Sequence, residues 1–245
     1  MSDFEAGVFL VDKPVGLTSF AIVARVRRIL GLKKVGHAGT LDPFATGLLI
    51  VCAGRPATKL ISRFMDGEKE YLATLCLGVE TETFDTEGEI TSKKAIENLY
   101  AEEIEKCIDE FRGPQLQVPP SYSALKHKGK PLYYYARKGI MIEKEPREIC
   151  IAHLDRMGEK NDLNGETAEL HLRVVCSKGT YIRTLASDIG KKLGCGAHLT
   201  GLRRTKSGCF SVENSLTADD FGAENARERF LEKMLSVEDV CKLLQ

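Results

Sequence analysis

Residues 36–47 have the sequence Gly-His-Ala-Gly-Thr-Leu-Asp-Pro-Phe-Ala-Thr-Gly. The glycines allow backbone angles and close ligand approaches that other residues resist, and Pro43 biases Asp42 toward an extended conformation. The small and turn-forming residues exclude a regular helix, so we predict a shaped loop that leads into the apolar segment 48–51. Such a loop fixes the carboxylate of Asp42 in one place. An Asp-Pro pair also suits a simple Asx turn, so the loop alone leaves the role of Asp42 open.

The residues that precede this loop predict a strand and a helix. Residues 7–12 form an apolar run that ends in a Pro/Gly turn, which indicates a buried strand. Thr18 or Ser19 can then cap a helix that reaches Leu30 and stops at Gly31.

The rest of the chain mixes strands and helices without strict alternation. The patterns predict strands at 70–79 and around 170–174, an acidic amphipathic helix at 92–111, an extended loop at 113–124, and helices at 132–138 and from 182 to the stop at Gly194. We therefore predict an α+β fold with a central mixed or antiparallel sheet flanked by helices and loops.

The charge is balanced overall but uneven along the chain. The 35 basic and 35 acidic residues give a formal net charge of zero. Residues 71–120 carry 4 basic and 11 acidic groups, whereas residues 121–210 carry 17 and 9. A basic middle region can present a cationic face to phosphates, although a mixed solvated surface explains the same numbers.

Cysteine spacing and hydropathy indicate a reduced, intracellular setting. The eight cysteines form no Cys-x-x-Cys pair, so we predict buried free thiols and no metal site. No run of 18 apolar residues and no N-terminal signal pattern is present, so we expect no membrane association and a cytoplasmic protein.

Seven motifs in order resemble the TruB family of tRNA pseudouridine synthases over roughly residues 7–210. They are Leu10-Val11-Asp12-Lys13-Pro14 with Gly16-Leu17-Thr18-Ser19; Val35 to Pro43 with Ala45-Thr46-Gly47; Lys69-Glu70-Tyr71; Leu77-Gly78 with Thr81, Thr83 and Asp85; Pro119 to Lys126; Lys178-Gly179-Thr180-Tyr181-Ile182-Arg183; and Gly196-Ala197-His198-Leu199 with Leu202-Arg203-Arg204. The resemblance implies a pseudouridine-synthase fold that isomerises uridine 55 of the tRNA T-loop, after flipping the nucleotide out, with no metal or cofactor.

The resemblance also implies roles for the catalytic residues. Asp42 would be the nucleophile or ion-pair stabiliser beside the sugar, and Arg183 would lie against it and keep it ionised. Tyr71 would stack on the target base and take part in proton transfer. Attack at C1′, attack at C6 and a glycal route all remain open. Without the family context, an exposed helix charge and ordinary sheet packing would explain Arg183 and Tyr71.

Further residues would bind the RNA substrate by the same resemblance. Tyr181 and Leu202 would line the base pocket, and His37 would fill the space that the flipped nucleotide leaves. Four cationic residues are candidate phosphate contacts: Lys13, Lys126, Arg203 and Arg204. Core packing and solvated surface charge are the structural alternatives for these residues.

The end of the chain differs from longer family members. We predict a catalytic domain at 1–212 and a short acidic helical segment at 213–245, with the C-terminal RNA-binding module of longer relatives missing or reduced. Since phosphate contacts dominate affinity, tRNA binding would then be weaker and more salt-sensitive.

Other classes of function remain possible beside the enzyme. A non-catalytic RNA-binding or tRNA-folding module could keep the same fold, but it would not need a desolvated carboxylate. A relative of dyskerin working in a guide-RNA particle is disfavoured because charged terminal extensions are lacking. We expect a monomer that binds the T-arm of tRNA and uses no guide RNA.

Overall fold

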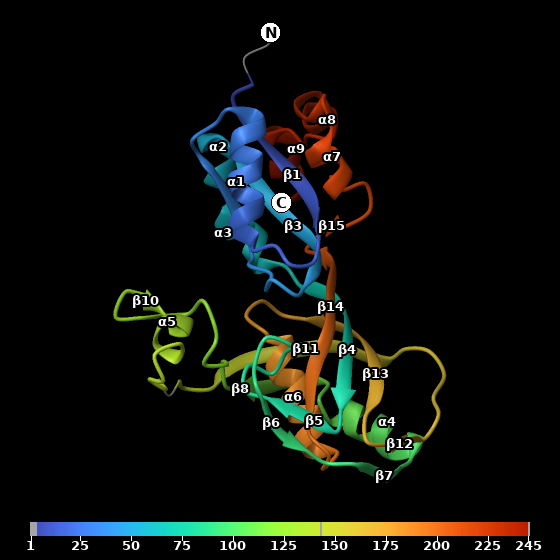
Figure 1. Ribbon diagram of the computed structural model, residues 1–245. Helices are drawn as coiled ribbons and strands as arrows, with labels where there is room; N and C mark the ends of the chain where they lie inside the picture. Colours follow the sequence, from blue (N-terminus) through green and yellow to red (C-terminus); the bar gives the residue numbers. More distant parts are fainter. Residues whose placement is uncertain (1–3, 143, 245) are drawn as a thin grey trace. The chain divides into compact units, whose positions relative to one another are not determined.

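The computed structural model describes residues 4–142 and 144–244, which form two compact units (Figure 1). The first unit is the chain up to Tyr71 together with the chain from Leu202 onward, and the second unit is the chain between them. The chain therefore leaves the first unit within β4 and returns to it within β14.

The first unit contains β1 (Gly7–Lys13), α1 (Ser19–Leu30), β2 (Val35–Ala38), β3 (Thr46–Ala53), α2 (Arg55–Thr58), α3 (Ile61–Asp66), the start of β4 (Lys69–Leu77), the end of β14 (Ala197–Ser207), β15 (Phe210–Ser211), α7 (Ala218–Gly222), α8 (Ala226–Glu232) and α9 (Val237–Leu243). Strand β3 is central and buried from Gly47 to its end. It pairs antiparallel with β1 and β2 and parallel with β14, where Arg203 lies opposite Thr46.

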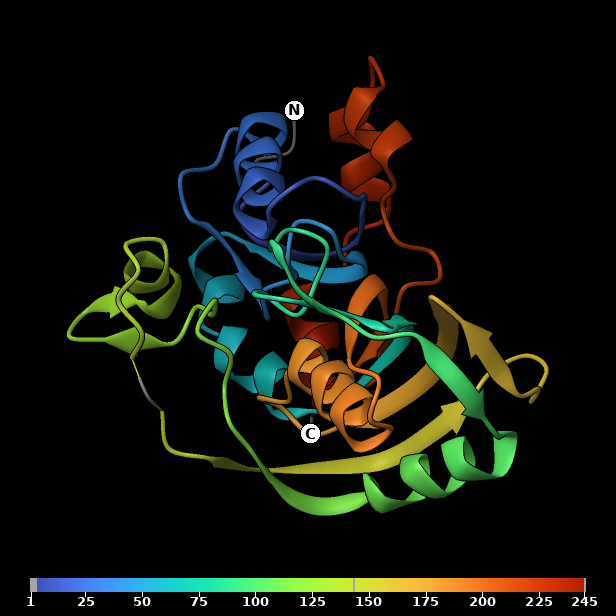
Figure 2. The same ribbon diagram turned by 60° about the horizontal axis from the view of Figure 1, so that its bottom comes forward.

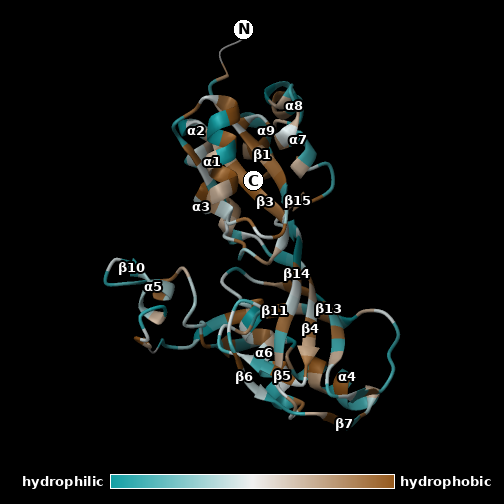
Figure 3. Cartoon of the chain, in the orientation of Figure 1, coloured by the Kyte–Doolittle hydropathy of each residue, from teal (hydrophilic) through white to brown (hydrophobic). Residues whose placement is uncertain are grey.

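Helices cover both faces of this sheet because β1 is apolar on both sides (Figure 3). Val8 packs in a cluster with Ile50 and with residues of α2, α3 and α9, including Val240. Phe9 points to the opposite face, as alternation along a strand requires, and its ring lies 5.6 Å from that of Phe230 in α8. The predicted strand at 7–12 and the predicted helix from Ser19 to Leu30 are confirmed.

The last part of the chain completes the edge of this sheet. Leu235 exchanges two backbone hydrogen bonds of 2.9 Å with Val8, and Leu216 bonds to the backbone of Leu10 and Asp12. Helices α7, α8 and α9 lie within residues 213–245, which the sequence predicts to form a short acidic helical segment. The division predicted at 212 falls inside the first compact unit.

Asp220 anchors this C-terminal segment, and we expect it to make the first unit sensitive to strong acid. The backbone N–H of Thr217, with ion pairs to Lys233 and Arg229, lowers the pKa of Asp220 to about 2. Because the folded-state pKa lies below the unfolded value, the stabilisation is full above about pH 4 and is lost as the pH falls toward 2. Asp220→Asn should cost about 2 kcal/mol at neutral pH by urea denaturation, and the difference from wild type should shrink below pH 4. An equal difference at pH 7 and pH 2.5 would contradict this assignment.

The second unit contains the rest of β4 and the start of β14, together with β5 (Val79–Thr81), β6 (Ile90–Lys93), β7 (Ile96–Leu99), α4 (Ala101–Glu110), β8 (Gly113–Gln117), β9 (Lys126–His127), β10 (Lys130–Pro131), α5 (Leu132–Ala136), β11 (Arg147–Arg156), β12 (Leu163–Gly165), β13 (Ala168–Cys176) and α6 (Ile182–Lys192). Its sheet has the order β14-β4-β13-β11-β8. Helix α4 lies along β11 and against α6 (Figure 2).

A small arm, residues 123–142, projects from the rest of the second unit in both views (Figures 1 and 2). It consists of the β9–β10 hairpin and α5. The predicted helix at 132–138 is therefore confirmed in position and is slightly shorter.

The sequence prediction was wrong for residues 92–100. The predicted helix at 92–111 is helical only over Ala101–Glu110, and its first part includes β7. Pairing between β7 and β12 places Leu99 opposite Leu163. Tertiary burial of Ile96 and Leu99 thus outweighs the helical spacing of these apolar residues. The α+β prediction with a mixed sheet flanked by helices is confirmed.

Candidate active site

The loop that carries Asp42 joins β2 to β3 and is fixed at several points. The Oγ of Ser19 accepts a hydrogen bond from the backbone N–H of Leu41 (2.9 Å) and donates to its carbonyl (3.1 Å). The N–H of Gly16 donates to the Pro43 carbonyl at 2.8 Å, and that of Ala45 donates to the Asp42 carbonyl at 3.1 Å. The half-buried Asp42 is therefore held on a well-connected turn beside the start of α1.

Lys13 is part of this scaffold, which corrects its prediction as a phosphate contact. Its side chain is fully buried, and its ammonium donates to the carbonyls of Pro14, Leu17 and Pro43 at 3.0, 2.7 and 3.2 Å. A buried cation with these acceptors cannot reach a phosphate at the surface. Lys13 instead connects the turn after β1 to the residue that follows Asp42.

Removal of the Lys13 ammonium should loosen the Asp42 turn. We expect Lys13→Met to lower the free energy of unfolding by about 2 kcal/mol, because a buried ammonium and its hydrogen bonds to three partly buried carbonyls are lost. The measurement is urea denaturation, with the exposed Lys59→Met in the same unit as control. Equal stability of the two variants would show that the ammonium does not hold the turn.

Arg204 is also internal, and the prediction that it contacts phosphate is wrong. It is 2% exposed, and its guanidinium donates to the carbonyls of Leu48 (2.7 Å) and Gly39 (3.0 Å). Its own carbonyl approaches Gly47 so closely that a Cβ there would lie 2.2 Å away, and Gly47 has a φ of +96°. Position 47 therefore requires glycine, and the backbone of β14 packs closely against the start of β3.

Arg203 forms a bidentate pair with Asp12 at 3.0 and 2.7 Å, yet its side chain stays 39% exposed. A phosphate contact by Arg203 therefore remains a prediction.

Leu202 is half-buried and adjoins Arg203, which pairs with Thr46 at the start of β3, so Leu202 lies at the end of β3 that is nearer to Asp42. Tyr71 is 9% exposed on β4, in the same unit.

His37 lies on β2, four residues before Leu41. Burial, and next the positive charge of Arg204, lower the pKa of His37, against an opposing hydrogen bond to Gly39. The imidazole is therefore neutral at neutral pH and suits stacking or hydrogen bonding better than ionic contact with phosphate. Its predicted role in filling the space left by the nucleotide stays a prediction.

In the second unit, Arg183 lies in the first turn of α6 and is 5% exposed. Its Nη1 is 3.2 Å from Oδ2 of Asp85 and donates to the Thr83 carbonyl at 3.0 Å, while Nη2 donates to the Tyr122 carbonyl at 2.7 Å. The guanidinium is thus fixed from several directions. Its predicted position against Asp42 joins residues of different units and stays a prediction.

Asp85 is a functional candidate that the sequence interpretation quoted in a motif but gave no role. It is 2% exposed and accepts hydrogen bonds from Thr83 Oγ1 and from the backbone N–H of Glu87. The signal that could have found it is the requirement that a buried guanidinium have an ionised partner. Asp85 supplies that partner for Arg183.

Tyr181 and Lys126 differ in how firmly they are held. The backbone of Tyr181 is bound on both sides by the Gln117 amide, at 2.8 and 3.1 Å, just before α6 begins. Lys126 is exposed on the arm. Their predicted contacts with RNA stay predictions.

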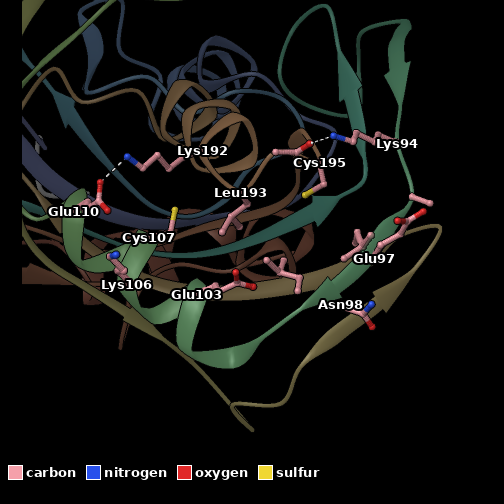
Figure 4. Close-up of a pocket in the computed structure, with 14 residues that line it drawn as sticks. Lys94, Glu97, Asn98, Glu103, Lys106, Cys107, Glu110, Lys192, Leu193 and Cys195 are labelled. Carbon is pink, nitrogen blue, oxygen red and sulfur yellow. Dashed lines mark hydrogen bonds and ion pairs between the residues drawn. The ribbon is translucent and has the colours of Figure 1, made fainter.

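A cavity of about 670 Å³ in the second unit contains none of these residues. It lies between β7, α4 and the end of α6, with an ion pair of 2.7 Å between Lys192 and Glu110 (Figure 4). Burial raises the pKa of its two thiols, that of Cys107 to about 11 and that of Cys195 above its ordinary value. Protonated thiols are poor nucleophiles, so Cys107 and Cys195 are not suited to nucleophilic catalysis in this cavity.

Residues 4–142 and 144–244 include neither a candidate metal site nor a candidate membrane-spanning helix. No group of three His, Cys, Asp or Glu side chains there could hold a metal ion. Nor does that part of the chain include a helix long and apolar enough to cross a membrane.

Comparison with known sequences gives matches over nearly the whole chain. Residues 27–182 match the family model described as TruB family pseudouridylate synthase (N terminal domain), and residues 183–240 match that of the tRNA pseudouridylate synthase B C-terminal domain. A protein of Desulfotalea psychrophila named tRNA pseudouridine synthase B is 69% identical, over 99% of this chain and 98% of that protein. A protein of the same name from Francisella philomiragia is 47% identical, over 96% and 75%.

Two solved structures of similar fold come from multi-component complexes. A chain of a Cbf5-Nop10-Gar1 complex has a TM-score of 0.72 and 29% identity, and the alignment covers 97% of this chain and 62% of that one. A chain of an H/ACA RNP bound to a substrate RNA containing 2′-deoxyuridine has a TM-score of 0.67 and 27% identity, with coverage of 97% and 61%.

Proposed function

Because the chain belongs to the TruB family of pseudouridylate synthases, we propose that it isomerises uridine to pseudouridine in tRNA, at position 55 of the T-loop. The relative that is 69% identical along its full length and bears the name tRNA pseudouridine synthase B is the observation that carries this proposal. We further propose that the target nucleotide is flipped out of the loop before it reacts.

The isomerisation needs few protein groups. The N1–C1′ bond must break, the uracil must turn, C5 must bond to C1′, and a proton must leave C5 while N1 gains one. In this proposal the Asp42 carboxylate serves as nucleophile or ion-pair stabiliser, and no metal or cofactor takes part. Attack at C1′, attack at C6 and elimination through a glycal all use one ionised carboxylate, so the proposal covers each.

Arg183 and the aromatic residues would prepare this carboxylate and the base. Arg183 cannot lose its charge, and in the proposal it keeps Asp42 ionised in a site from which water is excluded. Its fixed position beside Asp85 supports this role. Tyr71, Tyr181 and Leu202 would hold the uracil by stacking and apolar contact.

The chemistry of the arm supports binding to RNA. Residues 123–142 contain five basic residues and no acidic residue. Lys130 and Lys138 lie 4.4 and 4.5 Å from the ring centre of Tyr134, and Arg137 lies 5.5 Å from that of Tyr133. Cations and aromatic rings on one small element suit phosphates and unstacked bases. Lys126 would contribute to the same surface.

We propose that the chain acts alone, as a monomer in the cytoplasm, without guide RNA. The two structural relatives described above belong to complexes with other components, but the relatives with the higher sequence identities bear the name of a tRNA enzyme. The second candidate, a non-catalytic RNA-binding or tRNA-folding module, is favoured only by the basic arm. It does not explain the buried Asp85–Arg183 pair.

Site-resolved detection of pseudouridine tests this function directly. The purified chain is incubated with an unmodified tRNA transcript and with a matched transcript that has cytidine at position 55, and pseudouridine is mapped by position. We expect conversion at position 55 of the first transcript and none in the second. Conversion that requires an added guide RNA, or no conversion, would contradict the proposal.

A further inference from the structure

The arm is a small folded element with its own internal hydrogen bonds. The N–H of Leu132 donates to the Leu125 carbonyl at 2.7 Å, and that of Tyr133 donates to the Ser123 carbonyl at 3.1 Å. These bonds order the arm internally, but they do not fix its position on the second unit. One set of contacts that can fix this position is made just before Ser123, by Tyr122.

Tyr122 connects the root of the arm to two other parts of the unit. Its hydroxyl donates to Oε1 of Glu82 at 2.9 Å, and its carbonyl accepts from Nη2 of Arg183 at 2.7 Å. We call these two bonds the Tyr122 clasp. The same guanidinium pairs with Asp85, so the arm and the buried ion pair share one group.

Glu82 is itself well placed to act as a fixed acceptor. Its N–H donates to the carbonyl of Glu89 at 3.0 Å, and the Oγ1 of the preceding Thr81 donates to the Asp85 carbonyl at 2.7 Å. The hydrogen bond to Glu82 also raises the pKa of Tyr122, so the hydroxyl keeps the proton that it donates. The loop that holds Asp85 therefore also holds the arm.

We propose that Tyr122 and Glu82 are positioning residues that hold the arm ready for tRNA and link it to the Asp85–Arg183 pair. This inference rests on the proposed function for its kinetic consequence, because it concerns the binding of the same substrate. Neither residue touches the reacting atoms in the proposal. Their effect is to reduce the conformational freedom that the arm loses when RNA binds.

Loss of the hydroxyl should affect binding more than chemistry. We expect Tyr122→Phe to raise KM for tRNA about fivefold, the effect of one hydrogen bond to an exposed charged group, with kcat within twofold. Glu82→Ala should have the same effect, and the double variant should be no worse than either single variant. Glu82→Gln keeps an acceptor oxygen and should restore nearly normal KM. Tyr100→Phe, at a tyrosine that is 55% exposed elsewhere in the unit, is the matched control.

Limited trypsin digestion tests, in the absence of substrate, whether the Tyr122 clasp restrains the arm. The arm offers exposed cleavage sites, among them Lys126, Lys128 and Arg137. We expect cleavage in the arm to be about fivefold faster in Tyr122→Phe and Glu82→Ala than in wild type, Glu82→Gln and Tyr100→Phe, at equal Tm.

Equal rates of arm cleavage in wild type and Tyr122→Phe would overturn the proposal. So would a KM for Tyr122→Phe that is unchanged or lower, or additive effects in the double variant. If wild type makes no pseudouridine, the proposed function fails, while the digestion still decides whether the clasp positions the arm.

Discussion

Asp42→Asn is expected to reduce pseudouridine formation by at least about a thousandfold while changing the Kd for tRNA by less than about tenfold. Asparagine has nearly the same shape but cannot act as an anionic nucleophile or stabilise a cationic sugar. The turn is held by backbone groups and by Ser19 and Lys13, so it should keep its shape. Single-turnover conversion and filter binding measure the two effects separately.

The control for this variant is Asp219→Asn, an exposed carboxylate of the same unit. It should be indistinguishable from wild type in rate and in affinity. Normal turnover by Asp42→Asn would remove Asp42 from the mechanism. A parallel loss of tRNA affinity and of Tm would assign the residue to folding.

Asp85→Asn is expected to lower the free energy of unfolding by about 3 kcal/mol and the rate of conversion by at least about a hundredfold. The amide can still accept the hydrogen bond from Glu87, but the negative charge that lies 3.2 Å from the buried guanidinium of Arg183 is removed. Breaking one contact of a buried ion pair is far more costly than losing a surface pair. Urea denaturation and initial rates on a tRNA transcript measure both effects.

The Asp109–Arg112 pair is the matched control, since its side chains are 61% and 40% exposed. Asp109→Asn should cost less than about 0.5 kcal/mol. Replacing both Asp85 and Arg183, by Asn and Gln, should recover part of the stability but none of the activity. Equal destabilisation by Asp85→Asn and Asp109→Asn would refute the buried ion pair.

The local sequence pattern was sufficient to predict the structure of segments whose main contacts are with residues close by in the sequence. The helix from Ser19 to Leu30 has its cap, apolar face and Gly31 stop within one segment, and the structure matches it. The turn around Asp42 was likewise visible from its glycines and Pro43. The part that failed, residues 92–100, depends on pairing with β12, which is more than sixty residues away.

The burial of charged residues was the other feature that could not be predicted from the sequence. Lys13 and Arg204 look like surface cations in the sequence, because no pattern there shows that carbonyls of distant residues surround them. No sequence pattern assigned a role to Asp85, because its partner Arg183 lies almost a hundred residues further along the chain. Charge and motif identify which residues matter, but the direction in which a side chain points is decided by tertiary packing.

The backbone bonds between Leu235 and Val8 have a consequence for how the protein is made. Strand β1 is synthesised more than two hundred residues before Leu216 and Leu235, the residues that pair with its outer edge. Until then that edge is an exposed strand able to pair with another nascent chain. We therefore expect truncation just before Leu235 to give a product that aggregates during synthesis.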